Sequence, residues 1–135
     1  MIDRPVLTDW LREFLGRHGA VAGTVHVVDD ELLVIAAAIN IPPKVQEVTA
    51  KIPLGKGMAG LAWEHDKPIS TCNLKEDASG AVKPGARAVD ARAAVALPVH
   101  GGEGVRGVVG LAWADERDLA DELVTAIGRD AESMP

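Results

Sequence analysis

The chain has 135 residues, the length of one domain with a core of useful size. It carries 20 acidic and 14 basic residues, and its formal net charge of −6 argues against binding to a phosphate backbone. Three tryptophans, one phenylalanine and no tyrosine also argue against an aromatic platform for single-stranded nucleic acid. We therefore predict a single domain over residues 1–135 with no nucleic-acid partner.

The sequence also bears on the compartment. Cys72 is the only cysteine, so no disulfide can form within the chain, which fits a reducing environment. Asp3 and Arg4 precede Trp10 without the apolar segment of a signal peptide, and no run of 18 apolar residues occurs. We expect a cytoplasmic protein that has no membrane partner.

The first predicted element is an amphipathic helix from about Asp9 to His18. Apolar residues recur along it at helical spacing, at Trp10, Leu11, Phe14 and Leu15. Thr8 is the expected N-cap, and Gly19 the expected end. One face of this helix must pack on another element.

An antiparallel hairpin is expected next. Its strands span residues 21–28 and 32–39, joined by a turn at Asp29 and Asp30. The second strand is apolar on both faces, which is typical of a strand covered on both sides. One or two helical turns are expected over residues 44–50, after the proline pair at Pro42 and Pro43.

The segment Ile52–Trp63 predicts a strand end, a glycine turn and a helix. Gly55 and Gly57 can take positive φ, as a tight turn from strand to helix often requires. Gly60 falls inside the helix, where glycine costs about 1 kcal/mol relative to alanine. We infer that another stretch of backbone approaches Gly60 closely.

A short strand over residues 69–73 is expected after this helix, followed by residues 74–90, which show no clear period. A connection of this length is more often functional than neutral. The next hairpin pairs residues 91–100 with 105–113, and Pro98 predicts an edge or a bulge because it cannot donate to a ladder. In its second strand we expect one face to be shared by Val105, Val109, Leu111 and Trp113.

A last helix is expected after Asp115, its cap, and before Gly128, its end. Its apolar residues are Leu119, Leu123, Ala126 and Ile127. Antiparallel hairpins with helices gathered elsewhere predict an α+β fold with a central antiparallel sheet and helices on its faces.

At this point the sequence resembles a known family. The stretches IPLGKGMAGLAWEHDKPIS and ARAAVALPVHGGEGVRGVVGLAWAD are similar to the GAF domain. The shared pattern includes the glycine turn-helix, the Lys67-Pro68-Ile69 strand and two final strands with Pro98 and Gly110. The resemblance implies five or six antiparallel strands, a small-molecule pocket beside the turn-helix and the variable loop, and dimerisation through the terminal helices.

The functional branches of that family make different demands. Cyclic-nucleotide binders carry an Asn-Lys-Phe-Asp-Glu set, and here Phe14 lies in the wrong element. Covalent bilin binding needs a cysteine beside a histidine, whereas Cys72 precedes Asn73. Free-methionine sulfoxide reductases place a cysteine where this chain has Ala59, and a single thiol cannot both attack and resolve. We predict no enzymatic activity.

Six residues are candidates for a ligand site: Trp63, Cys72, Asn73, Val95, Leu97 and Trp113. For Cys72 the alternative is a small buried hydrophobe, and for both tryptophans it is a place in the core. His65, Asp66 and Cys72 lack metal-ligand spacing, so no metal is expected, and no cofactor can be named.

Two functions remain open ahead of a third, an enzyme of the methionine sulfoxide reductase kind. The first is a non-enzymatic sensory or regulatory module that binds a small molecule between the sheet and residues 74–90 and acts through a homodimer or a protein partner. The second is a scaffold for protein interaction or dimerisation without ligand, because small residues such as Ala94, Ala96 and Gly110 would let the pocket walls collapse.

Overall fold

A computed structural model describes residues 3–71, 91–115 and 118–135, and the following statements concern these residues. Its centre is a six-stranded antiparallel sheet with strand order β3-β2-β1-β6-β5-β4. The strands are β1 (Ala22–Asp29), β2 (Leu32–Ile39), β3 (Lys51–Pro53), β4 (Ile69–Thr71), β5 (Ala93–Gly101) and β6 (Gly104–Trp113). The helices are α1 (Arg4–His18), α2 (Pro43–Val48), α3 (Gly57–His65) and α5 (Asp121–Ala131). The α+β prediction with helices on both faces of an antiparallel sheet is confirmed.

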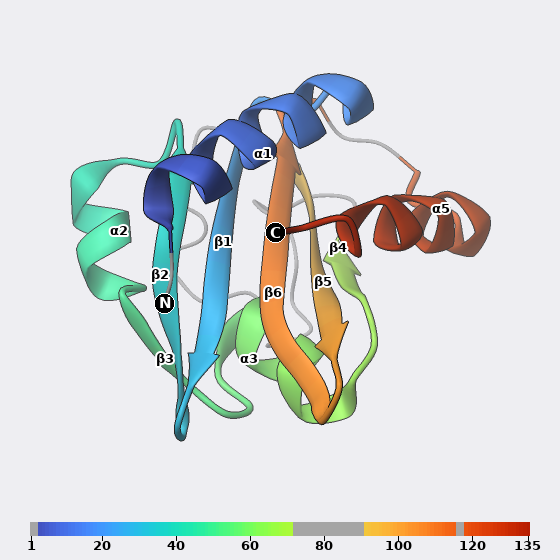
Figure 1. Ribbon diagram of the computed structural model, residues 1–135. Helices are drawn as coiled ribbons and strands as arrows, with labels where there is room; N and C mark the ends of the chain where they lie inside the picture. Colours follow the sequence, from blue (N-terminus) through green and yellow to red (C-terminus); the bar gives the residue numbers. More distant parts are fainter. Residues whose placement is uncertain (1–2, 72–90, 116–117) are drawn as a thin grey trace.

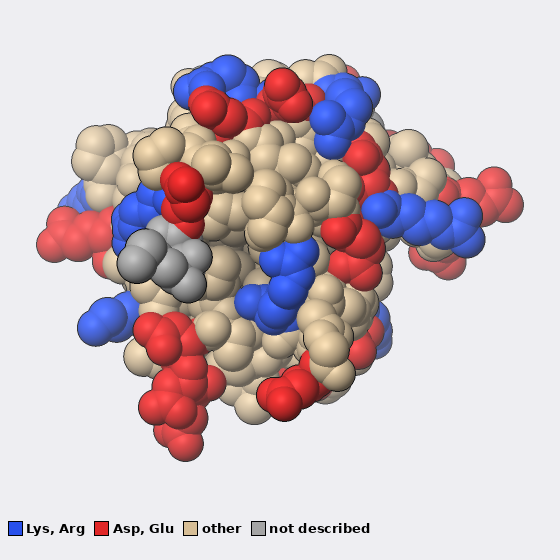
Figure 2. Space-filling model, viewed as in Figure 1, with Lys and Arg blue, Asp and Glu red and all other residues tan. Residues whose placement is uncertain are grey.

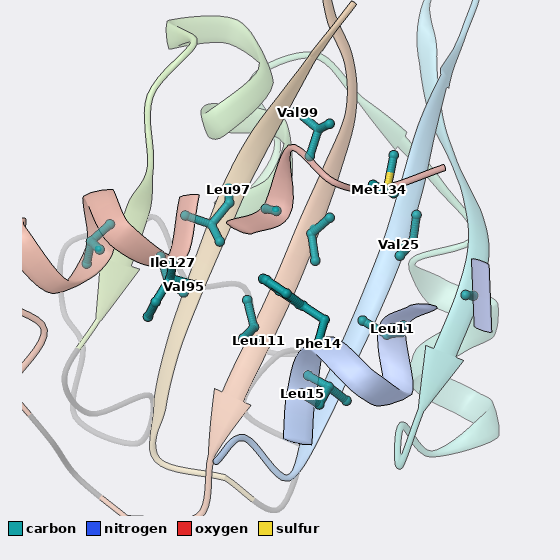
Figure 3. Packing of buried hydrophobic residues seen from close by; sticks show 14 of the residues in the cluster. Leu11, Phe14, Leu15, Val25, Val95, Leu97, Val99, Leu111, Ile127 and Met134 are labelled. Atoms are coloured by element: carbon teal, nitrogen blue, oxygen red, sulfur yellow. The ribbon is translucent and has the colours of Figure 1, made fainter. Parts of the chain in front are cut away.

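The two faces of the sheet are covered by different helices. In Figure 1, α1 crosses in front of the sheet with α5 beside it, while α3 lies behind the strands. The front face carries the largest buried cluster, in which Phe14 of α1 and Ile127 of α5 meet Leu97, Leu111 and other strand residues (Figure 3). The chain end closes this cluster, because Met134 is 4% exposed and packs into it.

The first helix begins five residues earlier than we predicted from Thr8. Asp3 is the N-cap, and its side chain accepts a hydrogen bond from the Val6 N–H at 3.2 Å. Pro5 lies in the first turn, where its ring suits the helical φ and its missing N–H costs nothing. Thr8 instead donates from Oγ1 to the Arg4 carbonyl, so the helix passes through it. The end at Gly19, with φ of 66°, is as predicted.

The hairpin of β1 and β2 is confirmed, and β2 has the predicted bounds. The register shifts between Val25 and His26, where Ala36 of β2 has no partner. This bulge places both Ala36 and Ala37 against the front cluster.

The hairpin of β5 and β6 is also confirmed, with a register shift between Val99 and His100. The shift corrects one prediction: Val109, Leu111 and Trp113 share the front face, but Val105 packs with Val108 on the rear face. A bulge inserts a residue and so inverts the alternation beyond it. The described part of β4 pairs only with Ala94–Ala96 of β5, so Pro98 lies beyond this pairing. The N–H that Pro98 lacks is therefore not needed for a hydrogen bond to β4.

The last helix differs most from its prediction. It begins at Asp121, its N-cap is Ala120, and Gly128 lies inside it. Leu123 is 44% exposed, and the buried face is formed by Val124, Ile127 and Ala131. Gly128 brings the helix close to β5, since a Cβ there would lie 3.7 Å from Cδ2 of Leu97. Among the described residues, no helix combines the length and apolar character needed to cross a membrane.

Candidate functional site

A cavity of about 300 Å³ lies on the rear face of the sheet, between the strands, α2, β3 and the start of α3. Its floor is the centre of the sheet, where it is lined by Thr24 of β1, Ala94 and Ala96 of β5, and Gly110 and Ala112 of β6. Its volume is at the lower end of the range for small-molecule pockets, roughly 300–1,000 Å³.

The floor is low because small residues are cross-strand neighbours. Ala94 pairs with Ala112 and Ala96 pairs with Gly110, and Gly110 in turn pairs with Thr24 on the next strand. A Cβ at Gly110 would lie only 3.0 Å from Oγ1 of Thr24, so even one methyl group is tight there. Three adjacent strands therefore present almost no side-chain volume at this point.

The side walls are apolar and come from separate elements. Val45 and Val48 project from α2, Ile52 from β3, and Met58 and Ala59 from the first turn of α3. These short elements hold a rim above the low floor, so that the space between them stays open. The scaffold hypothesis assumed that small residues let the walls collapse, whereas here the walls stand apart.

The glycine turn seats α3 at this wall. Gly55 and Gly57 have φ of 79° and 65°, as predicted for a tight turn into a helix. A Cβ at Gly60 would lie 2.8 Å from the Pro53 carbonyl oxygen and 3.2 Å from backbone atoms of Gly55. The predicted close approach of backbone to Gly60 is thus confirmed, and it fixes the start of α3 against β3.

His26 is the buried polar residue of the cavity wall. It is 2% exposed, and its Nε2 lies 2.9 Å from the Thr49 carbonyl oxygen. Because a carbonyl can only accept, Nε2 carries the proton and Nδ1 is an acceptor. Nδ1 is buried, and no described residue gives it a hydrogen bond. Burial lowers the pKa of His26 below its ordinary value, so the ring stays neutral at pH 7.

Two lysines are the charged residues of the wall. Lys51 of β3 and Lys56, the N-cap of α3, both line the cavity and are exposed. Neither forms an ion pair with a described acidic side chain. The site therefore joins an apolar interior to a positively charged rim.

The predicted site residues fall in different places. Val95 lines the cavity, although its side chain belongs to the front cluster. Leu97 and Trp113 share that cluster on the opposite face, at 0% and 1% exposure, because side chains alternate along β5 and β6. Trp63 packs beside Ala62 on the rear face, outside the cavity lining. Cys72, Asn73 and the segment 74–90 lie outside the described residues.

Sequence reasoning missed His26, Met58 and the two lysines. A signal for the site was present in β5 and β6, where small residues alternate with large ones, as in Ala94-Val95-Ala96-Leu97. For His26 no local signal existed, since its hydrogen-bond partner, the Thr49 carbonyl, lies 23 positions away. Among the described residues, no group of three or more His, Cys, Asp or Glu side chains is placed to hold a metal ion.

Comparison with known proteins gives one family and many structures of the same fold. A family model described as GAF domain matches residues 6–132. The type II free methionine-R-sulfoxide reductase of Thermoplasma acidophilum superposes with a TM-score of 0.75 at 14% identity, over 97% of this chain and 88% of that one. The second GAF domain of DevS from Mycobacterium smegmatis gives 0.70 at 24% identity, over 98% and 90%.

A third structure, the GAF domain of an Acinetobacter phosphoenolpyruvate-protein phosphotransferase, gives a TM-score of 0.73 at 13% identity, over 99% of this chain and 82% of that one. Likeness at such identities shows a shared fold alone. No curated protein sequence matches this chain.

Proposed function

Because the chain belongs to the GAF domain family, we propose that it is a non-enzymatic regulatory module that binds a small molecule in the cavity beneath α2 and α3. GAF domains are generally regulatory or sensory modules that bind small molecules. The observation that carries the proposal is the cavity itself, which remains open between apolar walls although its floor is made of glycine and alanine.

The proposal of a non-enzymatic role rests on the residues at the wall. The resemblance to free-methionine sulfoxide reductases assigns a cysteine to the position of Ala59, which lines the cavity here. Alanine supplies no nucleophile for attack on a sulfoxide. We therefore expect no turnover of methionine sulfoxide, and measurable turnover that is lost on Cys72→Ser would overturn this part of the proposal.

For the output we propose a homodimer or a protein partner that contacts the terminal helices. Arg17 of α1 donates two hydrogen bonds to Asp130 of α5, at 2.9 and 3.1 Å, and His18 Nε2 lies 2.7 Å from the same carboxylate. These bonds hold α1 and α5 as one unit. The face that they cover shows uncharged surface between acidic and basic groups (Figure 2).

The oligomeric state of the protein in solution tests whether it acts through a homodimer or a protein partner. Light scattering coupled to size exclusion, with and without a bound molecule, measures whether the protein forms a dimer and whether ligand shifts it. A monomer under both conditions, together with no partner recovered from the native cell, would overturn the proposed output but not ligand binding.

Ligand binding is tested by a thermal-shift screen against amino acids, nucleotides and amphipathic acids. A ligand at 100 times its Kd should stabilise the protein by about 2.7 kcal/mol. The blocking variant is Ala94→Leu, which places a larger side chain on the cavity floor. The matched control is Ala126→Leu on the exposed face of α5. Binding that survives Ala94→Leu unchanged would place the site elsewhere.

A further inference from the structure

The charge of the cavity is opposite to that of the chain. Acidic residues outnumber basic ones by 20 to 14, yet no Asp or Glu lines the described part of the cavity, and both of its charged lining residues are lysines. Lys51 and Lys56 come from different elements, β3 and the N-cap of α3, and both line this cavity. Two cations that form no ion pair with a described acidic side chain, placed beside an apolar cavity, attract an anionic group.

The start of α3 adds to this positive potential. The nine-residue helix begins at the cavity, which Gly57, Met58 and Ala59 line. Its N-cap makes no side-chain hydrogen bond, so among the described residues no side chain caps the first N–H groups of the helix. The N-terminal end of a helix carries a partial positive charge, and uncapped N–H groups there favour an anion.

Inside the cavity, His26 favours a hydrogen-bond donor on the ligand rather than a second anionic group. His26 lines the cavity and is held by its Nε2–H on the Thr49 carbonyl, and its buried Nδ1 has no hydrogen-bond partner among the described residues. A buried acceptor without a partner is destabilising, and a donor on a bound molecule would remove that cost. An O–H or N–H on the ligand meets this need, whereas a second carboxylate does not.

Resting on the proposed function, we propose that the ligand is a small amphipathic monoanion, a carboxylic acid with an apolar body and one hydroxyl or amide N–H. Its carboxylate lies between Lys51, Lys56 and the first N–H groups of α3. Its apolar body fills the space between Met58 and the Ala94–Ala96 floor, and its donor faces His26. The cavity of about 300 Å³ corresponds to roughly ten water volumes, which suits a body of about eight carbons.

The experiment compares three probes that share one apolar body: octanoate, octanol and octylamine, each titrated calorimetrically into the full chain. Octanoate is expected to bind about 10-fold more tightly than octanol, with octylamine the weakest. Added salt should weaken the binding of octanoate and leave the affinity for octanol unchanged. Octanol binding as tightly as octanoate would overturn the anion assignment and leave the proposed function standing. Failure of all three probes to bind would overturn the assigned ligand class, whereas the proposed function itself fails only if the broad thermal-shift screen also finds no ligand.

Charge variants locate the carboxylate. The double variant Lys51→Gln, Lys56→Gln is expected to weaken octanoate about 3- to 10-fold and to leave octanol unchanged. Lys67→Gln is the matched control, since Lys67 is exposed and follows the other end of α3. An equal loss of octanoate affinity in Lys67→Gln would show a general charge effect and overturn the placement.

Hydroxylated probes locate the donor. Within a series of octanoates hydroxylated at successive carbons, one isomer is expected to bind about 3- to 10-fold more tightly than octanoate. His26→Gln should remove that gain, because a glutamine amide can still donate to Thr49 but lacks Nδ1. A series in which no isomer gains affinity, or a gain that persists in His26→Gln, would overturn the role of His26.

Discussion

The two faces of the sheet use the same strands for opposite purposes. On the front face, Val95, Leu97 and Val99 of β5 pack with residues of α1 and α5 into a solid core (Figure 3). On the rear face the intervening Ala94 and Ala96 form the floor of a cavity. Because side chains alternate along a strand, one stretch of sequence can encode both surfaces. Stability is concentrated on one face, and space for a ligand on the other.

The helices follow the same division. On the front, α1 comes so close that a Cβ at Gly23 would lie 2.7 Å from Cδ2 of Leu15. On the rear, Gly60 lets α3 approach β3 while Met58 and Ala59 remain at the cavity wall. Close packing fills the space under α1, whereas the close approach of α3 fixes one edge of a space that stays open. This comparison leads to four measurements, given in order of decreasing effect.

Removal of a large side chain from the front face should have the largest effect. Phe14 is 0% exposed, stacks on Trp10 with a centroid distance of 4.8 Å and meets His18 edge-on. Phe14→Ala is expected to lower the free energy of unfolding by about 3–5 kcal/mol, measured by urea denaturation. Val48→Ala, at a rear residue that is 65% exposed, is the control and should change it by less than about 1 kcal/mol. Similar losses in both variants would contradict a solid front and an open rear.

Enlarging neighbouring alanines compares the two faces directly. Ala93 is 0% exposed in the front core, and Ala94 lines the rear cavity. Ala93→Leu should destabilise the protein by about 1–3 kcal/mol through overpacking, while Ala94→Leu should stay within about 1 kcal/mol because it enters free space. Thermal unfolding measures both. An equal cost at the two positions would show that the cavity is not open in solution.

Alanine substitutions at two helical glycines distinguish the effect of close backbone packing on stability from the effect of helix propensity. A Cβ at Gly60 would meet backbone of Pro53 and Gly55, whereas a Cβ at Gly16 of α1 would have no atom of a described residue within 4 Å. Gly60→Ala is expected to cost about 1–2 kcal/mol, because overpacking exceeds the propensity gain of about 1 kcal/mol. Gly16→Ala should stabilise by about 0.5–1 kcal/mol. Chemical denaturation distinguishes them, and a stabilised Gly60→Ala would refute the tight seat of α3.

Substitution of two histidines should change the free energy of unfolding least, and the two changes should depend on pH in opposite directions. The hydrogen bonds that the His100 ring donates to the carboxylates of Glu132 and then Asp66 raise the pKa of His100 above its ordinary value. Its contribution is therefore complete below pH 6.5, the ordinary pKa, and is lost as the pH rises through the higher folded-state pKa. For His26, burial lowers the pKa, so its contribution is lost as the pH falls below 6.5.

The test is the pH dependence of unfolding in variants. His100→Gln should reduce stability more at pH 6 than at pH 9, by less than about 1 kcal/mol because the three side chains are 41–54% exposed. His26→Gln should instead flatten the loss of stability toward acid pH. Identical profiles in wild type and His100→Gln would contradict the ion-pair cluster.

Local patterns predicted most of the fold because the responsible interactions are close in sequence. A run of β-branched and small apolar residues predicted β2 with its observed bounds, and the glycines of residues 55–60 predicted the turn into α3. Prediction failed at one helix start and at one β-bulge. Pro5 and Asp3 began α1 ahead of Thr8, and a bulge beside His100 turned Val105 to the rear face. Neither a bulge nor the choice between two caps is visible in periodicity alone.

By itself, the sequence determined the α+β class, the order of the strands along the chain and the small residues of β5 and β6. It also determined the close approach at Gly60, because each of these depends on local side-chain size and alternation. Only the tertiary structure decided that the small residues line an open cavity, that Leu97 and Trp113 belong to the opposite face, and that His26 lies in the cavity wall. Those facts depend on which strands become neighbours and on how far α2 and α3 stand from the sheet, and no local pattern carries that information.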